Sequence, residues 1–210
     1  MYTPPEFAMD GAATRRLLGD PGAVDLVTAT DHGLVASVVP MIFAPEVGEH
    51  GALQGHLARA NDHWQHRVHG PALAIVRGTD GYVTPSWYAA KAEHGRVVPT
   101  WNYLVAHVRG RLVVHDDAAW VERLVRRLTA YHEADRDAPW SVDDAPPGYL
   151  RRQLAAIVGV EVVIERVEAK AKLSQNRSDE DRAGVVDGLR RRGDAALAEA
   201  VDAARRTPGR

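Results

Sequence analysis

Short runs of β-branched and aliphatic residues, separated by turn residues, recur along most of this 210-residue chain. Runs of this kind predict strands, and short polar turns between them predict antiparallel hairpins. The Asp-Gly pair at residues 80–81 is a strong hairpin signal, and a second turn is expected near Gly110. At least six strands joined in this way favour a closed or nearly closed antiparallel barrel, which is an α+β fold. The predicted strands cover residues 24–30, 34–43, 52–57, 72–78, 81–85, 97–117 and 157–173.

Helices are predicted where apolar residues recur at helical spacing. In residues 118–133, for example, Trp120, Leu124 and Leu128 fall on one stripe. Neither an internal repeat nor a low-complexity linker interrupts the chain, so we expect a single domain over residues 1–206 and a flexible tail at residues 207–210. The other predicted helices are residues 10–18, 58–64, 147–154, 179–192 and 194–206, the last two forming a helical C-terminal extension.

The composition excludes several classes of protein. The chain has no cysteine, which rules out a disulfide framework, a thiolate metal site and a cysteine nucleophile. No apolar run is long enough to cross a bilayer and the first residues do not resemble a signal peptide, so a cytoplasmic protein is expected. The net charge of -2 lacks the basic excess of a dedicated nucleic-acid binder. Its arginine clusters lie among acids on predicted helices, which favours solvated helix faces.

Residues 82–102 are too polar for plain core and too aromatic for plain surface. This stretch holds Trp87 and Trp101 together with Lys91 and Asn102. Aromatic rings beside a few fixed donors are typical of a site for a planar, partly anionic ligand, because the ring stacks while the donors hold its polar edge and tail. Two further polar blocks, at residues 55–64 and 170–178, extend the pattern.

Several sequence blocks stand in a fixed order over nearly the whole chain. They are a start with Met1, Tyr2, Pro4 and Phe7, then GHLARAN (55–61), PSWYAAK (85–91), PTWNY (99–103), DAPPGYL (144–150), residues 157–176 and Gly184-Val185. Together they resemble the PaiB family of FMN-binding negative transcriptional regulators. The resemblance implies an FMN-binding split β-barrel with peripheral helices, working as a homodimer with the flavin site at the subunit interface. The family label admits DNA as a partner, which the charge does not support, and it implies no membrane association.

The GHLARAN block is expected to hold the FMN phosphate. A predicted strand runs into a helical turn here, and the free N–H groups at such a point favour an anion. Arg59 offers a fork of donors suited to phosphate, and His56 offers another donor. Alternatively, Arg59 only decorates a helix and His56 is a core histidine. The candidate cofactor residues of this block are His56, Leu57, Ala58, Arg59 and Asn61.

The PSWYAAK block is expected to contact the flavin as well. Ser86 is predicted to cap a helix, Trp87 to pack near the ring, and Lys91 to contact phosphate or flavin. In the structural alternative, Trp87 and Tyr88 plug the end of the barrel and Lys91 points outward.

The PTWNY block reads as a strand whose side chains alternate between two faces. Thr100 and Asn102 share one face and are predicted as polar ligands of the flavin. Trp101 completes the candidate set of this block, as a core residue or a dimer contact.

The KLSQN block places Lys172, Ser174, Gln175 and Asn176 close together. Amide side chains can bond the donor and acceptor atoms of the flavin pyrimidine edge. At a two-fold interface, these residues would also be able to serve the partner subunit's site. A capping loop is a compatible alternative, since Ser178 followed three residues later by an acid fits the N-terminal capping pattern.

No catalytic residue is assigned and no metal site is expected. Histidines at positions 56, 63, 66 and 69 lack a carboxylate at metalloprotease spacing, so a scattered solvent-facing set is favoured. Val38 stands where the resemblance implies a polar residue.

The sequence leaves three functions open. The first is an FMN flavoprotein linked to negative transcriptional regulation, and the second is an FMN-dependent oxidoreductase. A haem-binding split barrel is a minor third. Acids at the starts of both helices around Gly193 favour helix capping over contact with DNA phosphates.

Overall fold

The computed structural model describes residues 1–205, which form two compact units. The barrel unit comprises Arg16–Val76 and His107–Val167, and the helical unit comprises Met1–Arg15, Arg77–Ala106 and the chain from Glu168 onward. The expectation of a single domain over residues 1–206 stays a prediction. Residue 206, the last of the predicted helix, and the predicted tail at residues 207–210 lie outside the described residues.

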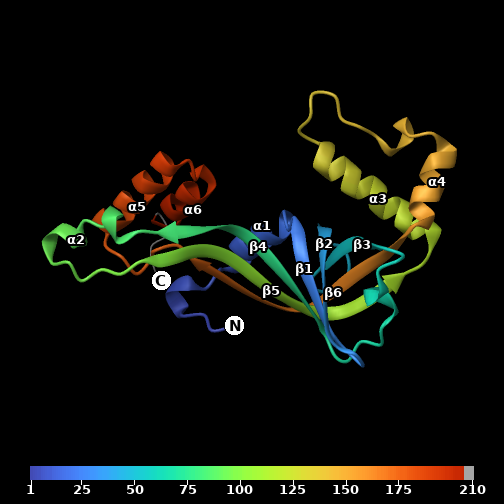
Figure 1. The fold of residues 1–210 in the computed structure, drawn as a ribbon, viewed down its shortest axis with the longest axis horizontal. Coiled ribbons are helices and arrows are strands. Elements are labelled where there is room, and N and C mark those ends of the chain that lie inside the picture. The colour runs from blue at the N-terminus through green and yellow to red at the C-terminus, as the bar shows by residue number, and fades with distance from the viewer. Residues whose placement is uncertain (206–210) are drawn as a thin grey trace. The chain divides into compact units, whose positions relative to one another are not determined.

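Six strands form a closed barrel in the order β1-β2-β3-β6-β5-β4 (Figure 1). The strands pair antiparallel: β1 with β2 and with β4, β2 with β3, and β3 with β6. The α+β barrel predicted from the sequence is therefore confirmed. The strands are β1 (Ala23–Thr30), β2 (Gly33–Ala44), β3 (Ala52–Ala58), β4 (Ala72–Val83), β5 (Thr100–His115) and β6 (Ile157–Lys172).

The helices fall close to the predicted positions. The helical turn expected at residues 58–64 is shorter and begins only at Asp62, because β3 continues to Ala58. The α-helices are α1 (Gly11–Gly19), α2 (Ala90–Glu93), α3 (Ala118–Glu133), α4 (Pro147–Ala155), α5 (Asp179–Arg192) and α6 (Ala195–Arg205). The 3-10 helices are η1 (Pro5–Phe7), η2 (Asp62–Gln65), η3 (Pro85–Trp87) and η4 (Val142–Asp144).

Both predicted hairpin turns inside long strands are wrong. β4 runs without a break through Gly81, and β5 runs without a break through Gly110. Each glycine permits close approach instead of a turn. A Cβ at Gly81 would lie 2.8 Å from the Leu197 side chain, and a Cβ at Gly110 would lie 2.1 Å from the carbonyl oxygen of Val163.

The barrel unit buries the inward face of its strands. Alternation along β1 buries Val24 and Leu26, as expected for a strand with one face in the core. Helix α3 packs on the outside through Leu124 and Leu128, which contact Ile42 of β2. The core thus has an inner layer within the barrel and an outer layer under α3.

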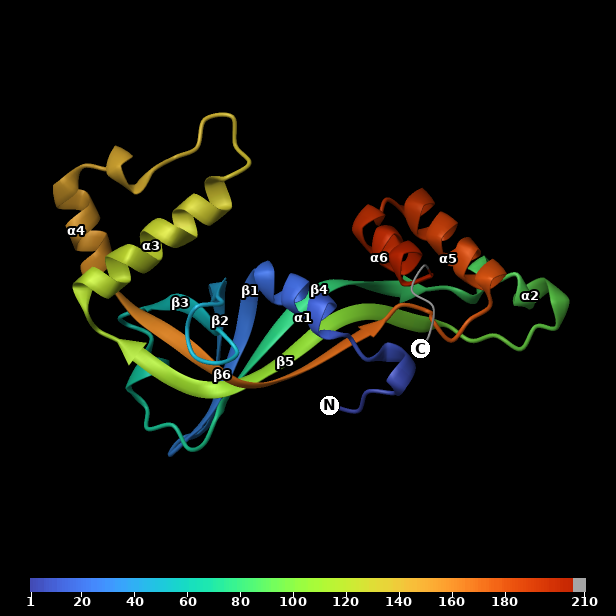
Figure 2. The ribbon, with the colours of Figure 1, turned by 180° about the vertical axis from the view of Figure 1, so that it is seen from behind.

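The helical unit is built around α5 and α6, which lie side by side in both views (Figures 1 and 2). Ser178 caps α5 by accepting the N–H of Asp181 at 3.1 Å, as the capping pattern predicts. Gly193 ends α5 in the left-handed region at φ 89°, which allows the chain to turn into α6. The apolar cluster of this unit includes Val83 and Tyr88 together with Val185, Leu189 and Leu197.

None of the helices described in residues 1–205 is long and apolar enough to cross a membrane.

Candidate functional site

The clearest candidate site in the helical unit centres on Lys172, at the end of β6. Its ammonium donates to the Thr100 hydroxyl and, at 3.0 Å, to the carbonyl oxygen of Trp101. The side chain is half-buried, and within residues 1–205 no carboxylate lies at ion-pair distance from it. An ammonium has three donors and both of these acceptors are neutral, so one donor and the full positive charge remain for a ligand. We call Thr100, Trp101 and Lys172 the Lys172 cluster.

Trp101 presents its ring to solvent beside this cluster. Half of the residue is exposed, so the core alternative is wrong and the dimer contact stays a prediction. Its indole N–H donates to Asp80 at 2.8 Å, and the ring of Tyr82 lies 6.2 Å away, centroid to centroid. Two partly exposed aromatic rings, one on β4 and one on β5, offer the stacking area that a planar ligand requires.

Asn102 and Ser174 hold each other instead of facing solvent. Asn102 is fully buried, and its amide nitrogen donates to the Ser174 hydroxyl at 2.9 Å. Gln175 folds back on its own loop, accepting from the Leu173 N–H at 2.7 Å and donating to the Ala171 carbonyl at 2.6 Å. The structure therefore gives all three side chains an internal role, whereas Asn176 is exposed.

The loop that these bonds fix has an unusual backbone. Ser174 has φ 63°, and among the described residues it alone enters the left-handed region without being glycine. In the described part of the chain the main-chain N–H groups of Ser174, Gln175 and Asn176 have no acceptor. Successive free N–H groups at a left-handed residue form a concavity that suits an anion.

The PSWYAAK block is divided between packing and surface. Trp87 lies against α5, with Arg192 over its ring at 5.2 Å, and Tyr88 is buried in the apolar cluster. This matches the structural alternative, except that the two rings pack on α5 and α6. Lys91 is exposed and donates to Ser86 at 3.1 Å. Ser86 is not the cap, because the Thr84 hydroxyl accepts the Ser86 N–H.

In the barrel unit, Arg59 is engaged by its own chain. Its guanidinium pairs with Asp116 at 2.5 Å and donates to the carbonyl oxygens of Ala155 at 2.9 Å and Ile157 at 3.2 Å. The hydrogen bond between Arg59 and Asp116 raises the pKa of Arg59 and lowers the pKa of Asp116. The Arg59 N–H is also taken, by the Ala156 carbonyl. The main chain at Arg59 therefore has no free N–H group to offer a phosphate at this strand end.

The other candidates of the GHLARAN block have mostly structural surroundings. Leu57 is a buried core residue and Ala58 is an exposed strand end. Asn61 caps η2 and donates to Ser37 at 3.1 Å. His56 is half-buried, and burial lowers its pKa, so at neutral pH it offers a donor without a charge.

Mutation of Arg59 separates a ligand role from an anchoring role. If Arg59 binds the phosphate, Arg59→Ala lowers FMN affinity by about 1.5–3 kcal/mol. Asp116→Asn, which removes only the counter-ion, should then keep or improve the affinity. Equilibrium titration with FMN measures both variants. Wild-type affinity in Arg59→Ala would assign the residue to anchoring the start of β6.

The predicted histidine set is not uniformly solvent-facing, because His63 is completely buried. Its Nε2 lies 2.8 Å from the Thr28 hydroxyl and its Nδ1 lies 2.9 Å from the Ser37 hydroxyl. Burial, aided by nearby His66, lowers the pKa of His63 below its ordinary 6.5. Within residues 1–205 no group of three His, Cys, Asp or Glu side chains is arranged to hold a metal ion.

His63 should make the protein less stable in mild acid. The folded state disfavours its protonation, so the unfolded chain binds more protons below pH 6.5 and the stability falls as the pH drops. His63→Gln should cost about 1–3 kcal/mol at pH 7.5 through lost hydrogen bonds, and it should flatten the pH dependence. Urea unfolding at pH 7.5 and 5.5 tests this, with exposed His50→Gln as the control. An unchanged slope in His63→Gln would contradict the assignment.

Two residues next to the candidate set were missed by the sequence reading. Tyr82 lies beside Trp101, and the Arg177 guanidinium lies 4.6 Å over the ring of Tyr88. Alternation along β4 signals Tyr82, because its neighbours Gly81 and Val83 are buried. Arg177 directly follows the KLSQN block, where a basic residue after three polar residues is the available signal.

The donor chemistry of the helical unit fits FMN, which carries a dianionic phosphate, a hydroxylated chain and a flat ring. An ammonium without a counter-ion and three free N–H groups suit the phosphate. The exposed indole of Trp101 suits the ring. The donors of the barrel unit fit less well, because Asp116 already compensates the charge of Arg59.

Comparison with known proteins identifies the family of this chain. The family model described as "Putative FMN-binding domain" matches residues 1–166. The chain is 30% identical over 191 residues to the protease synthase and sporulation protein PAI 2 of Bacillus subtilis, covering 90% of this chain and 89% of that one. It is 32% identical over 176 residues to a protein of Aspergillus fumigatus, covering 68% and 67%.

The fold also recurs in solved structures. A flavocytochrome from Azotobacter vinelandii superposes with a TM-score of 0.59 at 14% identity, over 83% of this chain and 73% of that one. An FAD- and haem-binding protein from Mycobacterium smegmatis gives 0.52 at 18% identity, over 85% and 79%. These likenesses show a split β-barrel of the kind found in flavin-binding proteins. The chain belongs to the FMN-binding family whose model it matches, and FMN is its cofactor.

Proposed function

We propose that this FMN-binding flavoprotein holds its cofactor at the Lys172 cluster, with the phosphate on the Lys172 ammonium. The observation that carries the proposal is a half-buried cation bound only to neutral oxygens. A partly desolvated cation without a counter-ion gains most from an anionic ligand, because water screens that interaction less than one at an open surface. The free N–H groups of residues 174–176 and exposed Asn176 supply further donors.

The ring system would lie near Trp101 and Tyr82, which are both partly exposed. When bound, FMN supplies the capacity to accept and pass on one or two electrons. The chain's own residues would bind and orient it: Lys172 compensates one of the two phosphate charges, Trp101 covers part of the ring, and Asn102 with Ser174 fixes the loop conformation. No general acid or base is assigned.

We also propose that the protein works as a homodimer with the flavin site at the subunit interface. Apolar residues that face solvent on the outside of β2 support a contact surface for a second subunit, since Leu34 is 79% exposed and Val38 is 67% exposed. The replacement of an expected polar residue by Val38 is consistent with a contact surface. Sedimentation equilibrium should give twice the chain mass, and a monomer at micromolar concentration would contradict the proposal.

For the biological role of the flavoprotein, we favour a link to negative regulation of transcription. The resemblance to the PaiB family implies this role, and the sporulation-related name of the Bacillus relative supports it. Direct contact of α5 and α6 with DNA is the less favoured route. The first turn of α5 carries Asp179, Glu180 and Asp181, and acids there repel phosphates. In its last turn, Arg192 is occupied by Asp194 and by the Tyr82 carbonyl.

An FMN-dependent oxidoreductase is the second candidate. The observation that favours it is the exposure of Trp101 and Tyr82, which would leave a bound ring accessible to a reductant or substrate. Incubation of the FMN-loaded protein with NADH or NADPH under anaerobic conditions distinguishes the oxidoreductase from the regulator. Reduction of the bound flavin would favour the oxidoreductase. The cytoplasmic location expected from the sequence stays a prediction.

The phosphate assignment is tested with two ligands that differ only in that group. Riboflavin lacks the phosphate, so the wild-type protein should bind FMN at least about tenfold more tightly than riboflavin. Quenching of flavin fluorescence during titration measures both affinities. Equal affinities would place the phosphate in solvent and overturn the proposal.

A further inference from the structure

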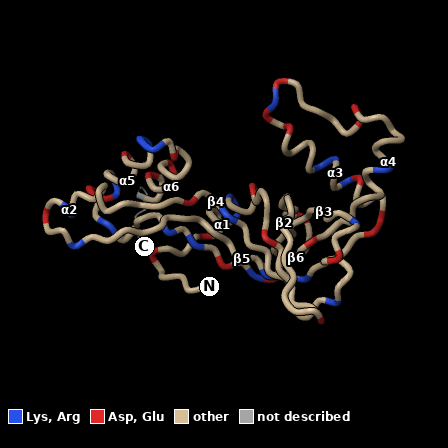
Figure 3. Tube along the Cα trace, in the orientation of Figure 1, with Lys and Arg blue, Asp and Glu red and all other residues tan. Residues whose placement is uncertain are grey.

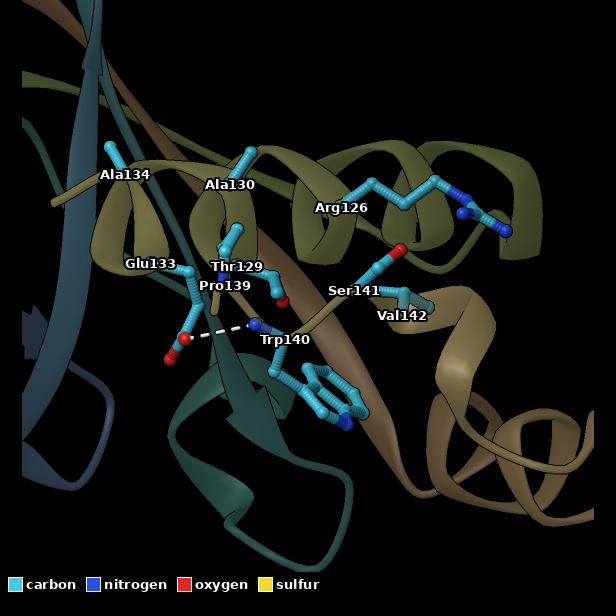
Figure 4. A pocket seen from close by; sticks show the side chains of 9 residues that line it. All are labelled: Arg126, Thr129, Ala130, Glu133, Ala134, Pro139, Trp140, Ser141 and Val142. Carbon is cyan, nitrogen blue, oxygen red and sulfur yellow. Dashed lines mark hydrogen bonds between the residues drawn. The ribbon is translucent and has the colours of Figure 1, made fainter. Parts of the chain in front are cut away.

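A small pocket in the barrel unit shares no lining residue with the proposed FMN site. It has a volume of about 330 Å³ and lies between the C-terminal half of α3 and residues 139–142 (Figure 4). That volume is at the lower end of the range for small-molecule sites. Apolar groups dominate its lining, which includes Ala130, Ala134, Pro139, Trp140 and Val142.

Trp140 is the main aromatic group of this pocket. Its residue is 49% exposed, and its main-chain N–H donates to the Glu133 carboxylate at 3.1 Å. Figure 4 shows Glu133 reaching from α3 to that N–H, with the indole extending beyond it. The hydrogen bond fixes the main chain of this segment against the helix, beside an acid.

The charges around the pocket are predominantly negative. One oxygen of Glu133, Oε2, contacts the Trp140 N–H and, at 3.5 Å, Arg136; in the described residues the other oxygen has no partner. Arg126 lines the opposite side, but Glu122 and Asp143 each pair with it at 2.9 Å and together raise its pKa. The positive charge of Arg126, the one cation of the lining, is therefore compensated by two carboxylates.

The segment that follows α3 adds further negative charge near the pocket. Residues 133–144 contain five acids and a single basic residue, Arg136. Acidic positions accordingly predominate along the trace between α3 and α4 (Figure 3). Asp135 and Asp137 are exposed, and η4 carries Asp143 and Asp144. An anionic ligand would be repelled here, and a cation would be attracted.

We propose that this pocket binds a small organic cation, namely a primary ammonium carried on an aromatic or branched aliphatic body. The ammonium would donate to the free oxygen of Glu133 and lie near the face of Trp140, an arrangement that combines a charge-assisted hydrogen bond with a cation–π contact. The apolar body would lie against Ala130, Ala134 and Val142. The inference is independent of the flavin, since the two sites share no residue.

The test compares benzylammonium with benzyl alcohol, which has the same shape without the charge. Titration is followed through the Trp140 indole N–H signal in a nitrogen-proton correlation spectrum, assigned with Trp140→Phe. The wild-type protein at low salt should bind the ammonium at least about tenfold more tightly than the alcohol. Added salt should weaken the preference.

Two variants make the test specific. Glu133→Gln keeps a carbonyl that can accept from Trp140 but removes the charge, so the preference should fall below about threefold. Glu6→Gln, an exposed acid of the other unit, is the matched control and should bind as wild type. FMN affinity should be unchanged in both variants, which keeps this result separate from the flavin proposal.

Three outcomes would overturn the inference. The first is equal binding of the two probes by the wild-type protein, which would leave a plain apolar hollow. The second is an undiminished preference in Glu133→Gln, and the third is binding that leaves the Trp140 signal unmoved. If Glu133→Gln is unfolded by circular dichroism, Trp140→Leu replaces it, with binding followed through the main-chain N–H signals of Ala130 and Ala134. That variant should weaken ammonium binding about threefold to tenfold with little effect on the alcohol.

Discussion

Lys172→Met is expected to weaken FMN binding by about 1.5–3 kcal/mol, or roughly tenfold to hundredfold. The variant keeps the length of the side chain and removes its charge. In the wild-type protein that charge faces only a hydroxyl and a carbonyl, so no internal ion pair is lost with it. The loss of the charge should therefore appear mainly in the ligand affinity, and the folding stability should fall only through the two lost hydrogen bonds to Thr100 and Trp101.

Riboflavin and a second variant make this result specific. Lys172→Met should bind riboflavin as the wild-type protein does, because riboflavin has no phosphate for the ammonium to contact. Arg15→Met removes an exposed positive charge from the same unit and should leave FMN affinity unchanged. A parallel loss of affinity for FMN and riboflavin in Lys172→Met would mean that Lys172 contacts the ring or chain and not the phosphate.

Gly184→Ala is expected to destabilise the protein by about 2–3 kcal/mol. A Cβ at Gly184 would lie 1.9 Å from the carbonyl oxygen of Trp87, a main-chain atom that cannot turn aside. One helical turn on, a Cβ at Gly188 would meet the Trp87 ring at 2.2 Å. The two glycines form a flat surface on α5 against which η3 packs, so a methyl group there separates the two elements.

The expected loss of folding stability in Gly184→Ala is opposite in sign to the usual effect of replacing glycine by alanine in a helix. Glycine to alanine inside a helix normally stabilises by up to about 1 kcal/mol. Gly148→Ala in α4 should follow that rule, since its Cβ would meet only arginine side-chain ends at 3.9 Å or more. Urea unfolding monitored by circular dichroism compares the two. Stabilisation in both variants would show that η3 does not pack on α5 this closely.

The barrel was predictable because alternation along a strand reports a buried face, as β1 shows. Turn chemistry was less informative, since a glycine has the same appearance in sequence whether it turns the chain or admits a neighbour. The sequence predicts turns at Gly81 and Gly110, yet the neighbours that require these glycines, Leu197 and Val163, lie far along the chain. Only the tertiary structure identifies them.

The candidate site was predictable in its composition and less so in the role of each residue. A polar side chain that binds a ligand and one that fixes a loop carry the same donors. The burial of Asn102 against Ser174 decides between these roles, as does the pairing of Arg59 with Asp116 across 57 positions of sequence. Lys172 stands out only after both partners are known to be neutral.

The absorption spectrum of the purified wild-type protein, incubated with excess FMN and then desalted, tests the central claim most directly. An FMN site at a cation without a counter-ion predicts retained flavin bands at close to one FMN per chain, and near-complete loss of these bands in Lys172→Met treated in the same way. A spectrum without flavin after desalting, together with no binding in titration, would contradict the account. A sharp Soret band in the protein as purified would replace FMN with haem.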